Sequence, residues 1–245
     1  LMPMLRRLYK IYAWLVFVPV LGVSTVILGT AVLPLLFFLP PPVVARLCGR
    51  SWARINSFVT PMRLTVEGRE HIDPRQSYVI VTNHQSHFDI FVLYGWLDID
   101  FKWVMKQELR QVPVIGIACD RLGHIYVDRS HHEAALASIN AAKRRITGGT
   151  SVIFFPEGTR SRDGRLRPFK KGAFKLALDL GLPILPITIS GTRDILPSDT
   201  LDLFPGRARM VIHPPLPVTG YTPETLPALM QRTREIIAAA LPAPE

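Results

Sequence analysis

The sequence predicts an α/β fold: a layered domain with a mostly parallel central sheet flanked by helices, preceded by an N-terminal membrane-associated helical hairpin. Two patterns lead to this prediction. From residue 61 onward, short β-branched runs alternate with longer helical segments, as in domains whose helices cover a central sheet. Before that, residues 11–45 carry no charge, a stretch longer than the roughly 20 residues that one membrane-spanning helix needs. We expect residues 1–60 to form membrane-anchoring helices and residues 61–245 to form the α/β domain.

The composition indicates a globular protein with an anionic partner. Of the 245 residues, 48% are hydrophobic, which is too many for a disordered chain. The 29 Lys and Arg residues against 19 Asp and Glu residues give a net charge of +10, typical of proteins that bind a phosphate-bearing substrate, anionic lipid or nucleic acid. Cys48 and Cys119 form no C-x-x-C pair and no disulfide framework, so a reducing compartment fits the chain.

Basic residues flank the uncharged stretch on both sides: Arg6, Arg7 and Lys10 before it, and Arg46, Arg50 and Arg54 after it. A signal peptide has a shorter apolar core of about 7–15 residues. A single span would leave one basic flank on the wrong side of the membrane, whereas a hairpin or re-entrant anchor keeps both flanks on the cytoplasmic side. Pro19, Pro34 and residues 40–42 offer places for the chain to bend. A buried core helix is the remaining alternative.

Residues 43–59 form an amphipathic helical pattern with Arg46, Arg50 and Arg54 spaced four residues apart. Such a helix can lie on an anionic membrane surface. An ordinary solvated basic stripe over a domain core has the same pattern, so both interpretations stay open.

The elements of the α/β domain follow from hydrophobic periodicity and from glycine and proline punctuation. Strands are expected at residues 62–67, 77–82, 101–105, 123–127, 151–155, 184–189 and 209–213. Helices are expected from Ser86 or His87 to residue 97, from a capping box at residues 130–133 to residue 146, at residues 171–180, and at about residues 223–240. The sequence shows no internal repeat.

A histidine and a carboxylate stand five residues apart where the strand at residues 77–82 gives way to a helix. In that turn Asp89 can accept a hydrogen bond from one imidazole nitrogen of His84, which leaves the other nitrogen free to take a proton from a substrate hydroxyl. Two other interpretations are a structural ion pair and a metal site built from His84, His87 and Asp89.

Cations follow three other strands, at the ends where parallel strands would meet the histidine. Lys106 follows residues 101–105, Arg129 follows residues 123–127, and Arg160 follows residues 151–155. Gly158 allows close backbone approach, and Thr159 offers a hydroxyl beside the planar guanidinium of Arg160. Convergence of these groups on one rim predicts a site for an anionic substrate. Pro183 and Pro186 belong to an apolar, stiff segment that either lines a groove or packs in the core.

Together these segments resemble the glycerolipid acyltransferases of the 1-acyl-sn-glycerol-3-phosphate acyltransferase (lysophosphatidic acid acyltransferase, PlsC) type. Residues 83–89 resemble the family's H-x4-D motif, residues 123–129 its second block, residues 155–161 its F-P-E-G-T-R-S block, and residues 182–187 its P-x-x-P block. All four occur in the family's order, within about residues 61–217. The resemblance makes residues 61–245 the acyltransferase catalytic domain.

The resemblance also implies roles for individual residues. His84 would be the general base and Asp89 its partner. The groups implied to hold the substrate's phosphate side are Glu157, Gly158, Thr159, Arg160, Arg129 and Lys106, while Pro183 and Pro186 would shape the acyl site. His87 has no catalytic counterpart and is interpreted as structural. No metal and no cofactor are implied, and backbone N–H groups near Ser86 are candidates for stabilising the oxyanion.

The expected reaction transfers a fatty acyl group from acyl-CoA or acyl carrier protein to the 2-hydroxyl of 1-acyl-sn-glycerol 3-phosphate, making phosphatidic acid. It would take place among membrane lipids, at the cytoplasmic face of the cell inner membrane. Alternatives are another lysolipid acceptor, a metal-dependent phosphoesterase that recruits His124 or His213, and a non-catalytic module that binds anionic lipid. Nucleic acid is not expected as a partner, because the basic residues are not interleaved with stacking aromatics.

Overall fold

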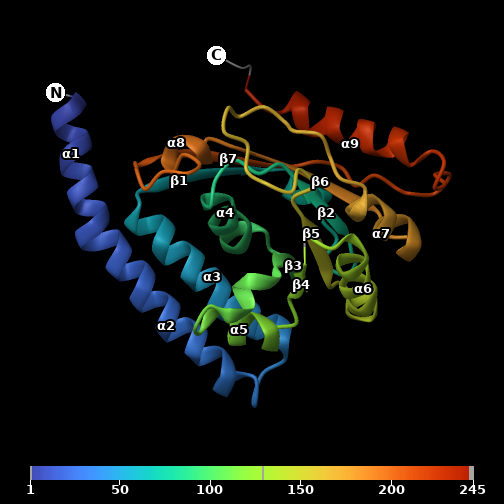
Figure 1. Cartoon of the computed structure of the whole chain (residues 1–245), viewed down its shortest axis with the longest axis horizontal. Helices are drawn as coiled ribbons and strands as arrows, with labels where there is room; N and C mark the ends of the chain where they lie inside the picture. Colours follow the sequence, from blue (N-terminus) through green and yellow to red (C-terminus); the bar gives the residue numbers. More distant parts are fainter. Residues whose placement is uncertain (1, 129, 243–245) are drawn as a thin grey trace.

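The computed structural model describes residues 2–128 and 130–242, and these begin with a helical hairpin. Helix α1 (Met2–Tyr12), a π-helical turn η1 (Ala13–Phe17) and α2 (Val18–Leu35) run on as one long rod. The chain turns at residues 36–40, and α3 (Pro41–Val59) packs back against α2 (Figure 1). The break predicted near residues 40–42 occurs at residues 36–40, with Pro40 as the N-cap residue of α3. Neither Pro19 nor Pro34 breaks α2. The π-turn lies directly before Pro19, where wider i→i+5 spacing accommodates a ring that lacks an N–H.

The long helix is mostly exposed. The segment Met4–Leu35 is long and apolar enough to cross a membrane by length and composition, and only 17% of its most apolar window is buried inside the structure. The inward side carries Val32, whereas Val23, Val26 and Ile27 are exposed. This exposure excludes the buried core helix that the sequence left open.

Two of the three cations in the basic stripe of α3 contact the α/β domain, while Arg46 is exposed. Arg50 pairs with Asp98 at 2.6 Å. Arg54 donates from Nε to the Gly95 carbonyl at 3.0 Å and lies over the ring of Trp96. These two cations therefore fasten the hairpin to the domain, which neither interpretation of the stripe had anticipated.

A single seven-stranded sheet forms the centre of the domain. Its strands are β1 (Met62–Glu67), β2 (Val79–Thr82), β3 (Phe101–Lys106), β4 (Ile125–Val127), β5 (Ser151–Phe154), β6 (Ile184–Ser190) and β7 (Gly206–Ile212). They lie in the order β1-β7-β6-β2-β5-β3-β4, and every neighbouring pair is parallel except β6 with β7. The carboxyl ends of β2 to β6 consequently share one rim, as the sequence predicted.

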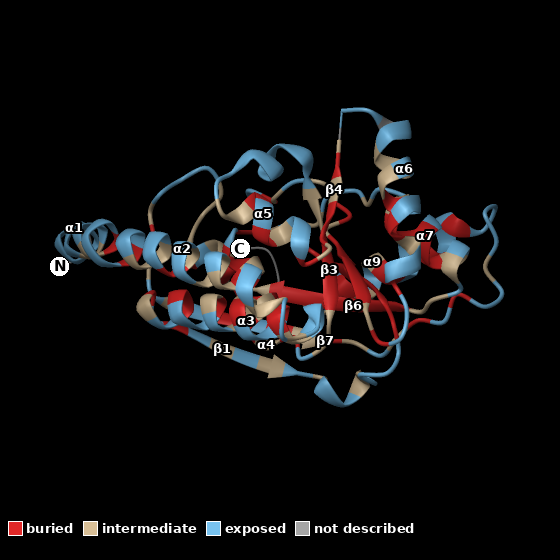
Figure 2. Cartoon of the chain, turned by 90° about the horizontal axis from the view of Figure 1, so that it is seen from below, coloured by how far each residue is buried: buried red, intermediate tan, exposed pale blue. Residues whose placement is uncertain are grey.

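Helices cover both faces of the sheet. On one face α4 (Phe88–Trp96) packs beneath α3, and on the other lie α6 (His132–Ala142), α7 (Gly172–Leu180) and α9 (Leu226–Ala239). Each face of the sheet has its own hydrophobic core, and the side chains of β2 alternate between them. Ile80 packs in the core beneath α4, and Val79 and Val81 pack in the core beneath α7 and α9. Figure 2 shows buried residues concentrated in the central strands and exposed residues along α1 and α2.

Most of the remaining elements are short and were not anticipated from the sequence. They are α5 (Ile115–Arg121), α8 (Thr192–Ile195), and the 3-10 turns η2 (Arg69–His71), η3 (Gln107–Gln111) and η4 (Lys143–Arg145). Segments of seven or fewer residues show too little periodicity to be recognised. The predicted capping box before α6 is wrong, because Ser130 donates to Asp128 and His131 is the N-cap residue.

Candidate active site

The turn between β2 and α4 holds the predicted histidine–aspartate pair together. His84 Nδ1 lies 2.7 Å from Asp89 Oδ2. Because the carboxylate accepts, the proton of the neutral ring lies on Nδ1, and Nε2 is left as the acceptor. The His84 side chain keeps 15% of its surface exposed, while that of Asp89 is fully buried. The geometry suits a base that meets substrate on one side and a fixed carboxylate on the other.

The buried carboxylate of Asp89 has four donors among the described residues. Oδ2 accepts from His84 Nδ1 and from the backbone N–H groups of Gln85 at 2.7 Å and Ser86 at 2.9 Å. Oδ1 accepts from the hydroxyl of Thr192 at 2.5 Å. A buried charge is tolerated when it is satisfied in this way. The N–H groups of Gln85 and Ser86 are therefore already engaged with Asp89. Stabilisation of an oxyanion by other backbone N–H groups near Ser86 stays a prediction.

The loop after β5 fixes the position of the histidine. The ring of Phe155 stacks on the His84 imidazole with centroids 3.9 Å apart. The backbone of His84 donates to Glu157 Oε1 at 2.8 Å, and its carbonyl accepts from the Ser161 N–H at 2.8 Å. The second oxygen of Glu157 accepts from the backbone of Arg167.

Glu157 does not reach the substrate side. It is 5% exposed, does not line the adjacent cavity, and has both carboxylate oxygens bound to main-chain N–H groups. Burial raises the pKa of its carboxyl, while those two hydrogen bonds oppose the shift. A carboxylate in this place holds two loops together, so the predicted phosphate contact of Glu157 is not supported.

A cavity of about 530 Å³ opens beside the histidine, within the size range of small-ligand sites. The polar and charged side chains in its wall include those of His84, His87, Lys106, Thr159 and Arg160. The rest is largely apolar and is contributed by α2, α3, β3 and α5, through residues that include Leu28, Val32, Trp52, Trp103, Ile115 and Leu122. The cationic side chains can receive an anionic group, and the apolar ones can pack against a hydrocarbon chain.

Four of the predicted phosphate-side residues, Lys106, Gly158, Thr159 and Arg160, meet in the wall of this cavity. Gly158 has φ +74°, a conformation that side-chain-bearing residues rarely adopt. The guanidinium of Arg160 lies 3.6 Å from Asp199. Arg129, the third cation predicted for this site, lies outside the described residues.

The structure does not bring Pro183 and Pro186 to the cavity. Pro183 immediately precedes β6, at the amino end of the strand and thus at the rim opposite His84. Pro186 pairs with Val81 in the parallel ladder, and its carbonyl accepts from the His213 N–H just beyond the β6–β7 register. A proline is tolerated there because its missing N–H faces the end of the ladder. Their predicted role in lining the acyl site is therefore not supported.

No set of metal ligands is assembled at the site. Within residues 2–128 and 130–242, no three His, Cys, Asp or Glu side chains are grouped so that they could hold a metal ion. His213 bonds Thr188 and His124 bonds Tyr94. The distant ligands that a metal-dependent phosphoesterase would recruit are thus engaged elsewhere.

His124 lies in a second, sealed polar network. It is 3% exposed, its Nδ1 accepts from the Trp103 N–H at 3.2 Å, and its Nε2 lies 2.6 Å from the Tyr94 hydroxyl. Burial, followed by the positive charges of Lys102 and Arg145, lowers the pKa of this imidazole to about 3. His124 is accordingly a neutral, structural histidine.

Sequence reasoning missed three contributors. His87 lines the cavity, and its pKa is lowered by burial and then by the nearby Arg160. Phe155 begins the F-P-E-G-T-R-S block, which was expected near His84. The stacking of its ring on the imidazole was not predicted. Thr192 is 103 residues from Asp89 along the chain, and no local pattern links the two.

A parallel sheet that gathers a histidine–aspartate pair, cations and an apolar cavity at one rim defines a protein suited to amphipathic, anionic ligands. The family model described as Acyltransferase matches residues 63–190, which is more than half of the chain. The chain belongs to the Acyltransferase family.

Relatives and a solved structure agree with this assignment. Over 174 residues the chain is 36% identical to 1-acyl-sn-glycerol-3-phosphate acyltransferase alpha of Homo sapiens, covering 71% of this chain and 62% of the relative. Over 168 residues it is 38% identical to a chloroplastic 1-acyl-sn-glycerol-3-phosphate acyltransferase of Brassica napus, covering 67% and 48%. The chain thus spans only about half to three fifths of these relatives.

The fold is also similar to the crystal structure of the 1-acyl-sn-glycerophosphate acyltransferase PlsC from Thermotoga maritima, with a TM-score of 0.81 and 28% identity. That match covers 96% of this chain and 95% of the other. The predicted fold class, including the helices before the sheet, is confirmed.

Proposed function

We propose that this protein transfers a fatty acyl group from the thioester of acyl-CoA or acyl carrier protein to the 2-hydroxyl of 1-acyl-sn-glycerol 3-phosphate, yielding phosphatidic acid for phospholipid biosynthesis. The observation that carries the proposal is the placement of His84, held by the buried Asp89, in the wall of a largely apolar cavity that Lys106 and Arg160 also line. The names of the relatives support the same reaction. The α/β domain, residues 61–245, is the catalytic part, and residues 1–60 are the anchor.

In this reaction His84 acts as a general base. Nε2 takes the proton of the 2-hydroxyl as its oxygen attacks the thioester carbonyl, and a tetrahedral intermediate forms. The carbon–sulfur bond then breaks, and the leaving thiolate takes the proton from the imidazolium. Asp89 holds the ring and stabilises its positive charge while the proton is there. Since a thiolate leaves readily, no enzyme nucleophile is needed.

The acceptor's phosphate is assigned to the cations of the cavity wall. Lys106 and Arg160 supply positive charge, and the planar guanidinium of Arg160 can meet two phosphate oxygens at once. Thr159 adds a hydroxyl donor. The acyl chain of the donor would extend between α2, α3 and α5, where the walls are apolar.

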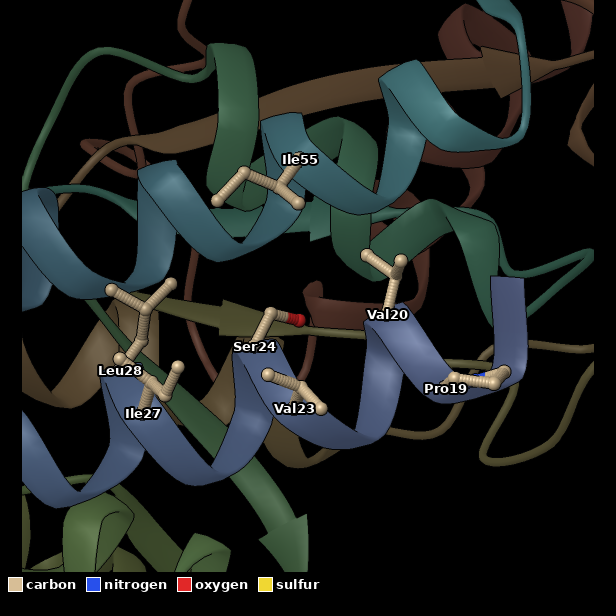
Figure 3. A pocket seen from close by; sticks show the side chains of 7 residues that line it. All are labelled: Pro19, Val20, Val23, Ser24, Ile27, Leu28 and Ile55. Atoms are coloured by element: carbon tan, nitrogen blue, oxygen red, sulfur yellow. The ribbon is translucent and has the colours of Figure 1, made fainter. Parts of the chain in front are cut away.

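The helical hairpin gives these lipids access to the cavity. An outward-facing groove of about 400 Å³ runs between α2 and α3, and Figure 3 shows its lining side chains. These are Pro19, Val20, Val23, Ser24, Ile27, Leu28 and Ile55, of which six are apolar. Leu28 also lines the cavity, so a lipid-facing surface and the acyl site share one helix wall. We infer that the hairpin enters the cytoplasmic leaflet of the inner membrane among membrane lipids.

The test is an acyl-transfer assay in detergent micelles with long-chain acyl-CoA and 1-acyl-sn-glycerol 3-phosphate, run with and without a chelator. The natural chain is expected to form product, and His84→Ala should lose about 10²–10⁴-fold of the rate. His71→Ala, which removes a histidine that does not line the cavity, is the matched control and should stay active. Product lost in both variants, or only in the presence of the chelator, would contradict a metal-free role for His84.

A second variant tests the choice of acceptor. Arg160→Ala should raise KM for the phosphate-bearing acceptor more than KM for the acyl donor. A selective donor defect would assign Arg160 to the thioester side instead. If no donor, including acyl carrier protein, yields product with this acceptor, another lysolipid becomes the substrate to try, and a non-catalytic lipid-binding module follows after that.

A further inference from the structure

The segment after β6 reaches into the active site through a turn that requires glycine. Gly191 has φ +83°, and a Cβ placed on it would lie 2.1 Å from the carbonyl oxygen of Arg207. This close approach sets Thr192 at the start of α8, where it is 0% exposed. β6 thereby delivers a side chain to the same rim as β2 and β5.

The rest of this segment is bound to the same turn. The hydroxyl of Ser86 donates to the Leu196 carbonyl at 2.7 Å, and that of Ser198 donates to the Gln85 carbonyl at 3.1 Å. Residues 191–198 therefore form a brace across the turn that carries His84. Within the brace, Thr192 alone among the described residues contacts the carboxylate of Asp89.

The two oxygens of the Asp89 carboxylate accept different numbers of hydrogen bonds. Oδ2 has His84 and two backbone N–H groups, whereas Oδ1 has Thr192 as its one donor within the described part of the chain. The terminal torsion of an aspartate is broad, so its oxygens can rotate unless both are held. Without the Thr192 hydroxyl, Oδ1 would be a buried anionic oxygen lacking that partner, and the carboxylate would be pulled to reorient.

We propose that Thr192 is a positioning residue for the reaction: its hydroxyl fixes the Asp89 carboxylate so that Oδ2 faces His84 Nδ1. The Nδ1–H tautomer of His84 is then maintained, and Nε2 is directed to the substrate as an acceptor. The catalytic consequence rests on the function proposed above. The effect of Thr192 on the His84 tautomer is independent of that proposed function.

Thr188 offers a matched control. It lies in β6, four residues before Thr192, and is 1% exposed. Its hydroxyl donates to the Ile237 carbonyl and contacts His213 Nε2, away from Asp89. Thr188→Val and Thr192→Val each remove one buried hydroxyl while keeping the shape of the side chain. Only the second should affect catalysis: we expect kcat to fall about 10- to 100-fold with KM within about twofold, as for a lost hydrogen bond to a charged group. Thr192→Ser should recover most of the rate.

A spectroscopic readout separates positioning from simple stability. In protein with ¹⁵N-labelled histidine, the His84 ring signals, assigned by their loss in His84→Ala, should report Nδ1–H in the natural chain, in Thr192→Ser and in Thr188→Val. Thr192→Val should show a mixture of both tautomers. If that variant is not recovered folded, Thr192→Cys replaces it, because a thiol is a weak donor, and a mixture is again expected.

Three results would overturn the proposal. They are an unchanged kcat in Thr192→Val, an equal loss in Thr188→Val, and an unchanged Nδ1–H signal in Thr192→Val. If no variant and not even the natural chain transfers acyl groups, the proposed function fails, and the tautomer measurement still decides what Thr192 does.

Discussion

Two histidines, His84 and His124, show how differently one fold uses the same side chain. Each lies next to a strand of the same sheet and is held by two or more polar partners. His84 has a carboxylate on its Nδ1 and keeps 15% of its side chain exposed toward a cavity. His124 has a backbone N–H on its Nδ1, a phenol on its Nε2, and is 3% exposed.

The two histidines differ in the charges that would surround the imidazole ring if it were protonated. At His84 it would create a cation beside the buried anion of Asp89, which compensates the charge. At His124 it would create a buried cation facing Lys102 and Arg145, and the pKa of about 3 reflects that cost. His84 thus has a buried carboxylate and a cavity beside its ring, whereas His124 has neither a carboxylate partner nor a place in the cavity wall.

The largest effect should come from removing that anion. Asp89→Asn keeps the shape of the side chain but removes its charge and offers an N–H where three donors now point. By analogy with histidine–aspartate pairs in which the same exchange leaves the wrong tautomer, kcat should fall about 10³–10⁴-fold. Steady-state kinetics in micelles provide the measurement, with a urea unfolding curve to confirm folding. A folded variant with near-natural kcat would show that His84 works without a carboxylate.

The residues around His84 show which features of the site could be predicted from the sequence. The His84–Asp89 pair was predictable because five positions separate its members and a strand-to-helix turn lies between them. The parallel strands, and with them the convergence of Lys106 and Arg160 on one rim, followed from the alternation of strands and helices. Local patterns were enough wherever the partners are close in the chain or follow strand ends.

Local patterns failed where a role depends on direction or on distant partners. Glu157 shares a loop with Arg160 yet points inward, toward the backbone of His84. Pro183 stands at the amino end of its strand, so the strand's own direction carries it away from the site. Thr192 meets Asp89 across 103 residues through a four-residue helix too short to predict. Each of these outcomes is fixed by the packing of the sheet rather than by the motif.

The opposite response is expected from the sealed histidine. His124→Asn leaves the Trp103 N–H or the Tyr94 hydroxyl without its partner in a buried place, which should lower the free energy of unfolding by about 2–4 kcal/mol. The kcat of the folded fraction should stay within about twofold. Urea denaturation and kinetics on the same sample test both. A large fall in kcat without a loss of stability would place His124 in the reaction and remove the contrast with His84.

The titration of His124 makes the stability depend on pH in a definite direction. Its pKa of about 3 in the folded protein lies below the ordinary value of about 6.5 expected in the unfolded chain, so the unfolded state binds the extra proton. The stability that this histidine contributes is present above about pH 6.5 and is lost as the pH falls toward 3. At pH 5 the loss should be about 2 kcal/mol.

The control for this prediction is the variant without the titrating group. Between pH 7 and 5, His124→Asn should show a shallower fall in unfolding free energy than the natural chain. Some slope should remain in both, because burial also lowers the pKa of His87 and His213. Parallel curves would mean that His124 is already protonated, or already exposed, in the folded protein.

The smallest effect on stability and kcat is expected at Tyr94, which lies between the cavity beside His84 and the polar network of His124. Tyr94 lines the cavity of His84 with part of its surface and accepts the Nε2 proton of His124 with its hydroxyl. Tyr94→Phe keeps the ring in the cavity wall and removes only the acceptor, so unfolding free energy should fall by about 1 kcal/mol and kcat by less than about twofold. Thermal or urea unfolding next to kinetics measures both. A loss of kcat larger than that of His124→Asn would show that the hydroxyl acts on the cavity, and the two histidine regions would then be coupled rather than separate.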